Sequence, residues 1–169
     1  WPSKWVAHCH CTMCQRAHGA AFVTWFGMEN ASVGIDDAAG ALRLGQALTP
    51  LRDRGVLVIG SGSLTHNLYE FRQHIADPEY AQAFADWVND AVIARDFDAL
   101  VDYRHRAPHA ERAHPTEEHY LPLLVAAGAS RPDDLAQRID GGMTYGVLSM
   151  DSFGFGLQDV DRHDRGAHA

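Results

Sequence analysis

Hydrophobic and polar positions follow two different patterns before and after about residue 41. In the first region, residues 5–7 and 21–26 are short apolar runs rich in β-branched and aromatic side chains, which predicts strands. Residues 31–40 are small and acidic without a clear period, so we expect a connection or a frayed strand there.

The second region opens with a predicted helix, a predicted strand and a glycine-rich loop. Three leucines recur at helical spacing and Gly55 is placed to end that helix. These leucines are Leu44, Leu48 and Leu51. Residues 56–59 form a continuous apolar run, typical of a strand buried on both faces, and residues 60–63 form a loop that can bring backbone close to a ligand. This order predicts an α/β fold with functional residues at the carboxyl end of the strand.

A longer helix is predicted from Pro78, with Asp77 as its N-cap. Its apolar stripe is expected in the core and consists of Tyr80, Phe84, Trp87, Val88 and Ala91. Residues 104–115 are polar and irregular, which predicts a loop.

The last predicted elements are a helix and a strand. Thr116 can cap a short helical stretch, which restarts at Pro122 and ends at Gly128. Residues 144–150 are predicted to form one strand, and the charged tail after Gly156 is expected to be disordered.

Composition narrows the class of protein. An apolar fraction of 46% is typical of a globular domain, and a formal charge of −8 without a basic cluster argues against nucleic-acid binding. No apolar run approaches the ~18 residues that a membrane span needs. The chain opens with Trp1 and lacks an apolar leader, so we expect an internal part of a longer reading frame.

All three cysteines lie in one cluster: Cys9, Cys11 and Cys14. Three thiolates within six residues are a poor disulfide framework but a plausible zinc site, which suits a cytoplasmic protein. The alternative is three buried cysteines without metal.

Residues 5–25, WVAHCHCTMCQRAHGAAFVTW, resemble the central motif of the glutathione-dependent formaldehyde-activating (GFA, CENP-V-like) family. The resemblance covers about residues 1–43 and implies that the three cysteines bind the zinc of a carbon–sulfur lyase. The cysteines of that family's second, structural zinc have no counterpart here, so we do not expect lyase activity.

Two of the eleven histidines stand out by position. His66 follows the predicted strand and its glycine loop, and His119 lies near a helix start; a neutral imidazole at either place could bind a metal or take a proton. The ordinary alternative is a surface histidine satisfied by water. That alternative is our expectation for the following: His74, His105, His109, His114, His163 and His168.

The motifs around these two histidines resemble class III extradiol ring-cleavage dioxygenases of the 4,5-DOPA dioxygenase type. They are GVLVIGSGSLTHNL at residues 55–68 and HPTEEHYLPLL at residues 114–124, followed by GVLSM at residues 146–150. The resemblance implies a non-haem Fe(II), sometimes Zn(II), and a catechol opened with O₂. His66 matches an acid/base or metal neighbour, and His119 matches a metal ligand. The family's Gly-His-Gly and Ser-Ala-His-Trp motifs, which carry the other metal histidines, have no counterpart in this chain.

The expected fold class is therefore α/β: a partial extradiol-dioxygenase-like sheet with flanking helices, preceded by a small β zinc-binding fragment. The expected domains are residues 1–43, 44–156 and a tail at 157–169. We expect an extradiol dioxygenase of catechols that is incomplete and inactive alone. The alternatives are a GFA-like zinc module and a fusion remnant without function. An incomplete sheet would expose an edge and favour association, including homo-oligomers.

Overall fold

The structure is a computed structural model that describes residues 5–9, 23–27, 37–73 and 77–157. Its contacts divide the chain into two compact units, Trp1–Ile35 and Asp36–Ala169. None of the helices in the described ranges combines the length and apolarity that a bilayer crossing requires. The tail expected after Gly156 lies, from residue 158 onward, outside the described residues.

The first unit contains an antiparallel pair of strands, β1 (Trp5–Cys9) and β2 (Val23–Gly27), with Ala7 opposite Trp25. Strands were predicted in both places. Cys11 and Cys14 lie outside the described residues, so zinc binding by the cysteine cluster stays a prediction.

In the second unit, α3 (Ala38–Arg52) packs against α9 (Leu121–Gly128) along a contact of small residues. A methyl group on Gly45 would overlap the Val125 carbonyl oxygen, and one on Gly128 would overlap that of Leu42. The two helix backbones therefore touch directly. Both helices were predicted, and Gly55 adopts the left-handed conformation, with φ of 78°, just beyond α3.

An aromatic core lies between α5 (Pro78–Ala94), α6 (Phe97–Val101), α7 (Tyr103–Arg106), α8 (Ala110–Ala113) and α9. The rings of Tyr103 and Tyr120 stack at 3.9 Å between centroids, and Phe84 packs edge-on to both. The predicted stripe of α5 is buried here, except that Trp87 is half-buried.

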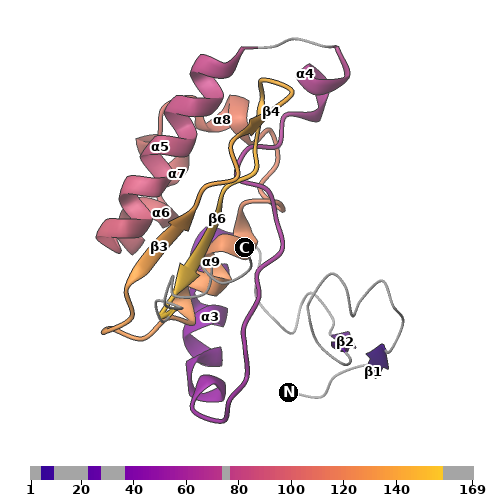
Figure 1. The fold of residues 1–169 in the computed structure, drawn as a ribbon, viewed down its shortest axis with the longest axis vertical. Coiled ribbons are helices and arrows are strands. Elements are labelled where there is room, and N and C mark those ends of the chain that lie inside the picture. The colour runs from indigo at the N-terminus through magenta and orange to yellow at the C-terminus, as the bar shows by residue number, and fades with distance from the viewer. Residues whose placement is uncertain (1–4, 10–22, 28–36, 74–76, 158–169) are drawn as a thin grey trace, which may run out of the picture. The chain divides into compact units, whose positions relative to one another are not determined.

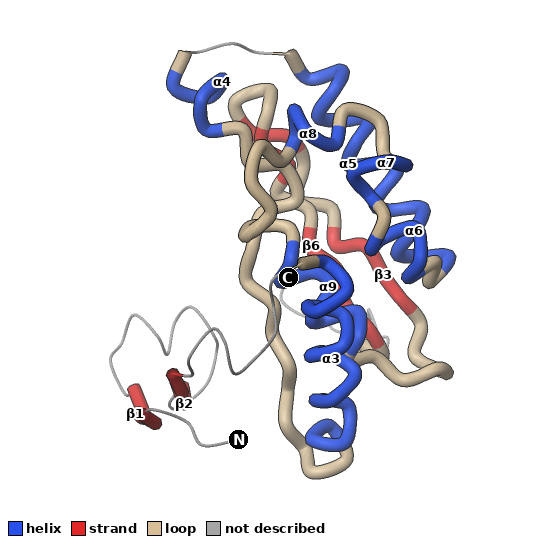
Figure 2. Tube along the Cα trace, turned by 180° about the vertical axis from the view of Figure 1, so that it is seen from behind, coloured by secondary structure: helices blue, strands red, loops and turns tan. Residues whose placement is uncertain are grey.

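Two antiparallel pairs complete the second unit. β3 (Ala136–Ile139) pairs with β6 (Ser152–Phe155), and β4 (Met143–Thr144) pairs with β5 (Leu148–Ser149). β3 contacts α5 and β6 contacts α9, so the β3–β6 pair lies over one face of the helices, in front of them in Figure 1 and behind them in Figure 2. This mixture of helices with small sheets agrees with the expected α/β class.

The single strand predicted at residues 144–150 is wrong, because this segment contains a tight turn between β4 and β5. Tyr145 and Gly146 both have positive φ, 54° and 72°, and the Val147 N–H donates to the Thr144 carbonyl. Two consecutive left-handed residues reverse the chain within the three residues that separate Thr144 from its partner Leu148. The apolar period alone does not reveal that reversal.

The loop predicted at residues 104–115 is also wrong, since α7 and α8 occupy most of it. Each is a single turn, too short to produce a helical period in the sequence. A further short helix, α4 (Leu68–Arg72), follows His66 and was not anticipated.

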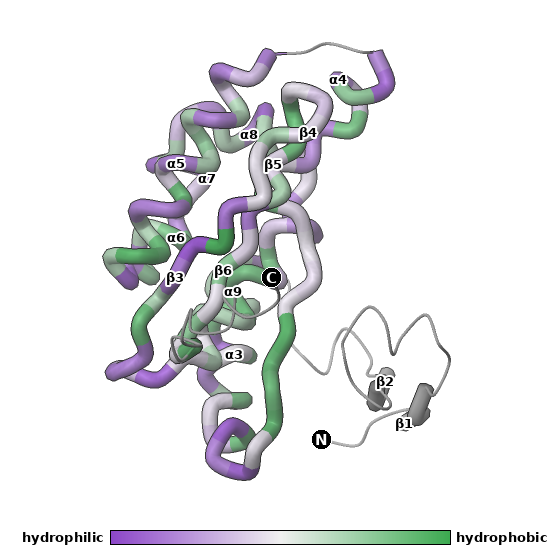
Figure 3. The backbone as a smooth tube through the Cα atoms, viewed as in Figure 1, coloured by the Kyte–Doolittle hydropathy of each residue, from purple (hydrophilic) through white to green (hydrophobic). Residues whose placement is uncertain are grey.

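The largest departure concerns the strand predicted at residues 56–59. The segment is extended, but it belongs to no sheet among the described residues, and Leu57 is 76% exposed. It forms the apolar stretch coloured green between α3 and the loop that follows (Figure 3). The expected burial required a strand on at least one side, and none of the described strands pairs with it.

Candidate functional site

The imidazole rings of His66 and His119 lie against each other. Their centroids are 3.5 Å apart and their planes differ by 26°, so the rings are stacked. Both side chains are half-buried, which leaves one side of the pair open to solvent or a ligand. The structure thus brings together the two histidines that the sequence motifs singled out.

His66 is held by buried neighbours on both sides of it in the chain. The His66 N–H donates to the Ala113 carbonyl over 2.8 Å. The Thr65 hydroxyl donates to the Val147 carbonyl over 2.8 Å and accepts from the Ser149 N–H over 2.7 Å. Because Thr65 is completely buried, the β5 hairpin fixes the backbone from which the His66 ring projects.

His119 is held between the glycine loop and the aromatic core. The Ser63 N–H donates to the His119 carbonyl over 3.0 Å, and a side chain on Gly62 would overlap that same carbonyl oxygen. The next residue, Tyr120, is buried and its hydroxyl donates to the Leu100 carbonyl over 3.0 Å. The glycine loop was expected to bring backbone close to a ligand; within the described residues its close approach is to the start of α9.

His114 was predicted to be a surface histidine, and this is wrong. It has no exposed surface, and its ring packs against Phe84 and Tyr120. Its Nε2 lies 2.7 Å from the Leu64 carbonyl oxygen, and since a carbonyl only accepts, the Nε2 carries the proton and donates. Composition and spacing do not distinguish a buried histidine from an exposed one, because the aromatic pocket is built from distant segments.

Two other histidines agree with the surface prediction. His105 and His109 are both exposed, and the His105 ring pairs with the Asp102 carboxylate one turn earlier, at 2.6 Å. His74, His163 and His168 lie outside the described residues.

Burial lowers the pKa of two histidines, His66 and His114. Burial is the main cause that lowers the pKa of His66; the neighbouring His119 lowers it further and the carboxylate of Glu118 opposes this. Burial also lowers the pKa of His114 to about 4. Both rings are therefore neutral near pH 7, and His66 is able to accept a proton there.

The donor set of the pair is incomplete for a metal centre. In the parts of the chain that the structure describes, no group of three or more His, Cys, Asp or Glu side chains could hold a metal ion. Two imidazoles are suitable donors for Fe(II) or Zn(II), but an open non-haem iron site normally uses three protein ligands.

The part of the chain that contains His66 and His119 is similar to known proteins. A sequence profile described as the catalytic LigB subunit of aromatic ring-opening dioxygenase matches residues 27–148. The 4,5-DOPA dioxygenase extradiol of Beta vulgaris is 38% identical over 116 residues, which cover 67% of this chain and 42% of the relative. The protein of the same name from Portulaca grandiflora is 35% identical over 122 residues, which cover 70% and 45%.

A solved structure has a similar fold. The uncharacterized protein JW3007 from Escherichia coli K12 superposes with a TM-score of 0.60 at 30% sequence identity, covering 71% of this chain and 51% of that one. The present chain therefore spans about half the length of the proteins it matches.

The profile match begins at residue 27, within the region expected to be GFA-like, and it offers no support for that second resemblance. The boundary at residues 43 and 44 and the zinc fragment stay predictions. The match contains both His66 and His119, whose motifs predicted the family. By a profile match over most of its length, this chain belongs to the LigB family of class III extradiol dioxygenases.

Proposed function

We propose that this chain contributes His66 and His119 to the active site of a metal-dependent dioxygenase that opens catechol rings with O₂. The observation that carries the proposal is the stacking of these two imidazoles at 3.5 Å inside the region matched by the LigB profile. The matched relatives named 4,5-DOPA dioxygenase extradiol support a catechol as the class of substrate.

The stacked arrangement favours different roles for the two rings. The lone pair of an imidazole nitrogen lies in the ring plane, so two nearly parallel rings do not direct their lone pairs at one ion. We assign His119 as the metal ligand, because it stands in the motif at residues 114–124 at the position that matches a metal ligand of the family, and its backbone is fixed between the glycine loop and Tyr120. His66 is assigned as the acid/base, because its neutral ring can take a proton from a catechol hydroxyl.

A bound Fe(II), or Zn(II) in its place, would supply charge stabilisation for the ionised catechol and, for iron, the means of reacting with O₂. The chain's own residues would do the remaining work: the half-buried His66 moves the proton, and the buried Thr65 and Tyr120 keep both rings in place. Further ligands would have to come from outside the described residues.

We also propose that the cysteine cluster binds Zn(II) and that the protein works in the cytoplasm. Cys9 is the last residue of β1, and Cys11 and Cys14 follow it within five residues of the sequence. Three thiolates so closely spaced are ligands that zinc prefers, with a fourth position left for another donor.

Metal analysis with matched variants tests both sites. The affinity of the histidine site for Fe(II) or Zn(II), measured on the purified chain, should fall at least tenfold in His119→Ala. It should remain unchanged in His105→Ala, a control at an exposed histidine. Zinc at the cysteine cluster should instead be lost on thiol alkylation and survive His119→Ala. If the alkylated chain, with its cysteines blocked, bound metal equally well with and without His119→Ala, the assignment of His119 as a ligand would be wrong.

A catalytic measurement tests the acid/base role. If ring cleavage of a DOPA-type catechol is observed, alone or with an added polypeptide, His66→Ala should lower kcat about 100-fold or more. Activity that persists fully in His66→Ala would contradict the role of His66.

A further inference from the structure

The segment that carries His66 is hydrogen-bonded to the segment that leads into His119. The His66 N–H donates to the Ala113 carbonyl over 2.8 Å. The next residue, Asn67, is buried, and its Nδ2 donates to the Arg112 carbonyl over 2.8 Å. These two bonds hold the backbone at His66 against the part of the chain that comes shortly before His119.

The Arg112 side chain extends this link to α4, the short helix that follows His66. Its Nε and Nη2 donate to the two carboxylate oxygens of Glu70, over 2.8 and 3.2 Å. Its Nη1 donates over 2.8 Å to the carboxylate of Asp77, at the start of α5. The guanidinium carbon also lies 3.9 Å from the ring centroid of the buried Tyr80. One arginine thus joins α4, α5 and α8 at the end of the second unit where these helices meet (Figures 1 and 2).

The chemistry of this ion pair makes it more rigid than an ordinary surface contact. The planar guanidinium matches the two oxygens of one carboxylate, which fixes the orientation of Glu70 as well as its distance. The Glu70 side chain is only 12% exposed, so solvent screens the pair less than it screens a pair at the surface. Because two carboxylates offset its charge, Arg112 is better suited to joining elements than to binding an anionic ligand.

Few other contacts hold α4 among the described residues. None of its side chains is buried, and the Phe71 ring meets the ring of Tyr145 edge-on, with 5.1 Å between centroids. The first turn of α4 is capped by Asn67, whose Oδ1 accepts from the Glu70 N–H over 3.1 Å. Asn67 therefore connects α4 to the backbone of Arg112, and the Glu70 carboxylate makes the second connection.

The direction of the His66 ring depends on anchors on both sides of it in the chain. Before His66, the buried Thr65 is bonded to the β5 hairpin. After it, the anchors are Asn67 and Glu70, which the Arg112 carbonyl and guanidinium hold. Loss of the guanidinium should therefore loosen the backbone after His66 and let the ring turn away from its stacked partner.

We propose that Arg112 is a positioning residue that keeps the His66 ring stacked on His119. This inference rests on the proposed function, in which the two rings share one active site and have separate roles there. Arg112 acts through α4 and through the segment that it shares with His119. Such support matters for catalysis, because a displacement of about 1 Å at a reacting group can lower a rate roughly 100-fold.

Nuclear Overhauser effects between the ring protons of His66 and His119 measure the stacking directly in the purified, metal-free full chain. We expect these effects to disappear in Arg112→Ala, and amide exchange at Glu70 to become about tenfold faster as α4 opens. The control is Arg106→Ala, which removes an exposed arginine of α7 that pairs with a nearby aspartate. Both measurements should be unchanged in that control.

A second variant tests the same link from its other side. Glu70→Ala breaks the pair with Arg112 while leaving the arginine its contacts with Asp77 and Tyr80. It should abolish the ring–ring effects as Arg112→Ala does, and the double variant should show no further change, because both substitutions remove one link. Circular dichroism establishes that each variant is folded, and Glu70→Ala decides the outcome if Arg112→Ala does not fold.

A kinetic measurement separates positioning from substrate binding wherever ring cleavage is observed. Arg112→Ala should lower kcat about tenfold and leave KM unchanged, because Arg112 acts on the placement of the His66 ring. A raised KM at unchanged kcat would overturn the proposal, since it would mean that Arg112 binds the substrate.

Ring–ring effects that persist in both folded variants would also overturn the proposal, as would their loss in Arg106→Ala. Full activity of His66→Ala would have a different meaning. It would contradict the proposed acid/base role of His66, while the effect of Arg112 on the stacking of the two rings would still be measured in the metal-free chain.

Discussion

At the scale of single residues, His114 connects the aromatic core to the segment that carries His66. Its Nε2–H donates to the Leu64 carbonyl, two residues before His66, while its ring is enclosed by Phe84, Tyr103 and Tyr120. No hydrogen-bond partner is found for its Nδ1 among the described residues. A proton added there would place a charge in an apolar pocket, which explains why burial lowers its pKa.

This arrangement predicts a loss of stability in mild acid. The unfolded chain binds the proton at the ordinary pKa of 6.5, whereas the folded chain resists it down to about 4. The stabilising effect is therefore complete above pH 6.5 and is lost progressively as the pH falls toward 4, by about 3 kcal/mol in all. Urea unfolding followed from pH 7.5 to 4 measures it.

The matched variant is His114→Gln, whose amide can still donate toward Leu64 but does not titrate. Between pH 7 and pH 4, the original chain should lose about 3 kcal/mol more unfolding free energy than His114→Gln does. A constant difference would show that His114 is not the group responsible. His105→Ala, at an exposed ring, should change stability by less than about 1 kcal/mol at any pH in this range.

At the scale of elements, the contact between α3 and α9 depends on glycine rather than on the leucines that revealed α3 in the sequence. Leu44, Leu48 and Leu51 are only half-buried, whereas Gly45 is buried against α9. The helical period correctly indicated the element, but the residue type at the closest approach was decided by the distance between two backbones.

Gly45→Ala should therefore destabilise the protein, although alanine is ordinarily the better helix former. The added methyl group overlaps the Val125 carbonyl, and displacing α9 should cost about 1–3 kcal/mol in thermal or urea unfolding. The neighbouring exposed Gln46→Ala serves as the control and should stay within about 0.5 kcal/mol. A stabilised Gly45→Ala would mean that the helices are less closely packed than described.

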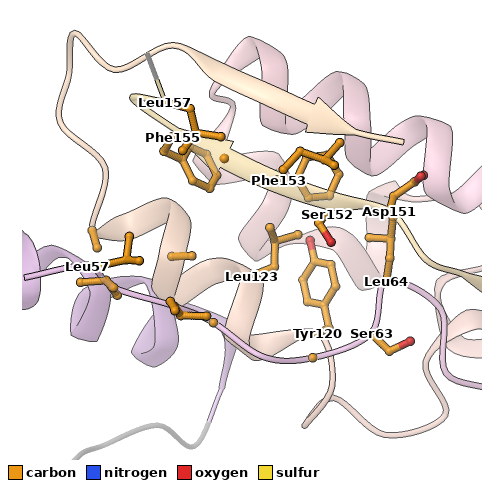
Figure 4. A pocket seen from close by; sticks show the side chains of 18 of the residues that line it. Leu57, Ser63, Leu64, Tyr120, Leu123, Asp151, Ser152, Phe153, Phe155 and Leu157 are labelled. Atoms are coloured by element: carbon orange, nitrogen blue, oxygen red, sulfur yellow. The ribbon is translucent and has the colours of Figure 1, made fainter. Parts of the chain in front are cut away.

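At the scale of the whole molecule, the second unit exposes an apolar surface that a folded domain normally covers. The exposed side chains of Leu57 and Ile59 line the cavity between residues 57–60 and β6 (Figure 4), and no described strand protects them. Contiguous apolar surface of this kind marks an interaction site or a site of aggregation.

The free chain should accordingly bind the dye ANS, which reports exposed apolar surface. Fluorescence should fall by at least half in the double variant Leu57→Lys, Ile59→Lys. It should remain unchanged in the control Leu135→Lys, since that exposed leucine does not line the cavity. Equal fluorescence in the original chain and both variants would indicate that Leu57 and Ile59 are covered in solution.

The sequence by itself determined the features that depend only on neighbouring residues, namely helices, a helix end and the family motifs. The helix from Pro78 follows from its first-turn proline and an apolar stripe, the end of α3 from Gly55, and the family from two short motifs around His66 and His119. Asp77 stands at the N-cap position as predicted, but its carboxylate pairs with Arg112 and makes no capping hydrogen bond. Each of these features is encoded within about fifteen neighbouring residues, so pattern and spacing suffice.

Only the tertiary structure decided how distant segments meet. The stacking of His66 on His119, the burial of His114 and the exposure of Leu57 all depend on partners far away in the chain or lacking among the described residues. An apolar run predicts that a segment can be buried, but burial itself requires a neighbouring surface. Hydrophobic contact is non-directional, and a linear pattern does not say which neighbour supplies that surface.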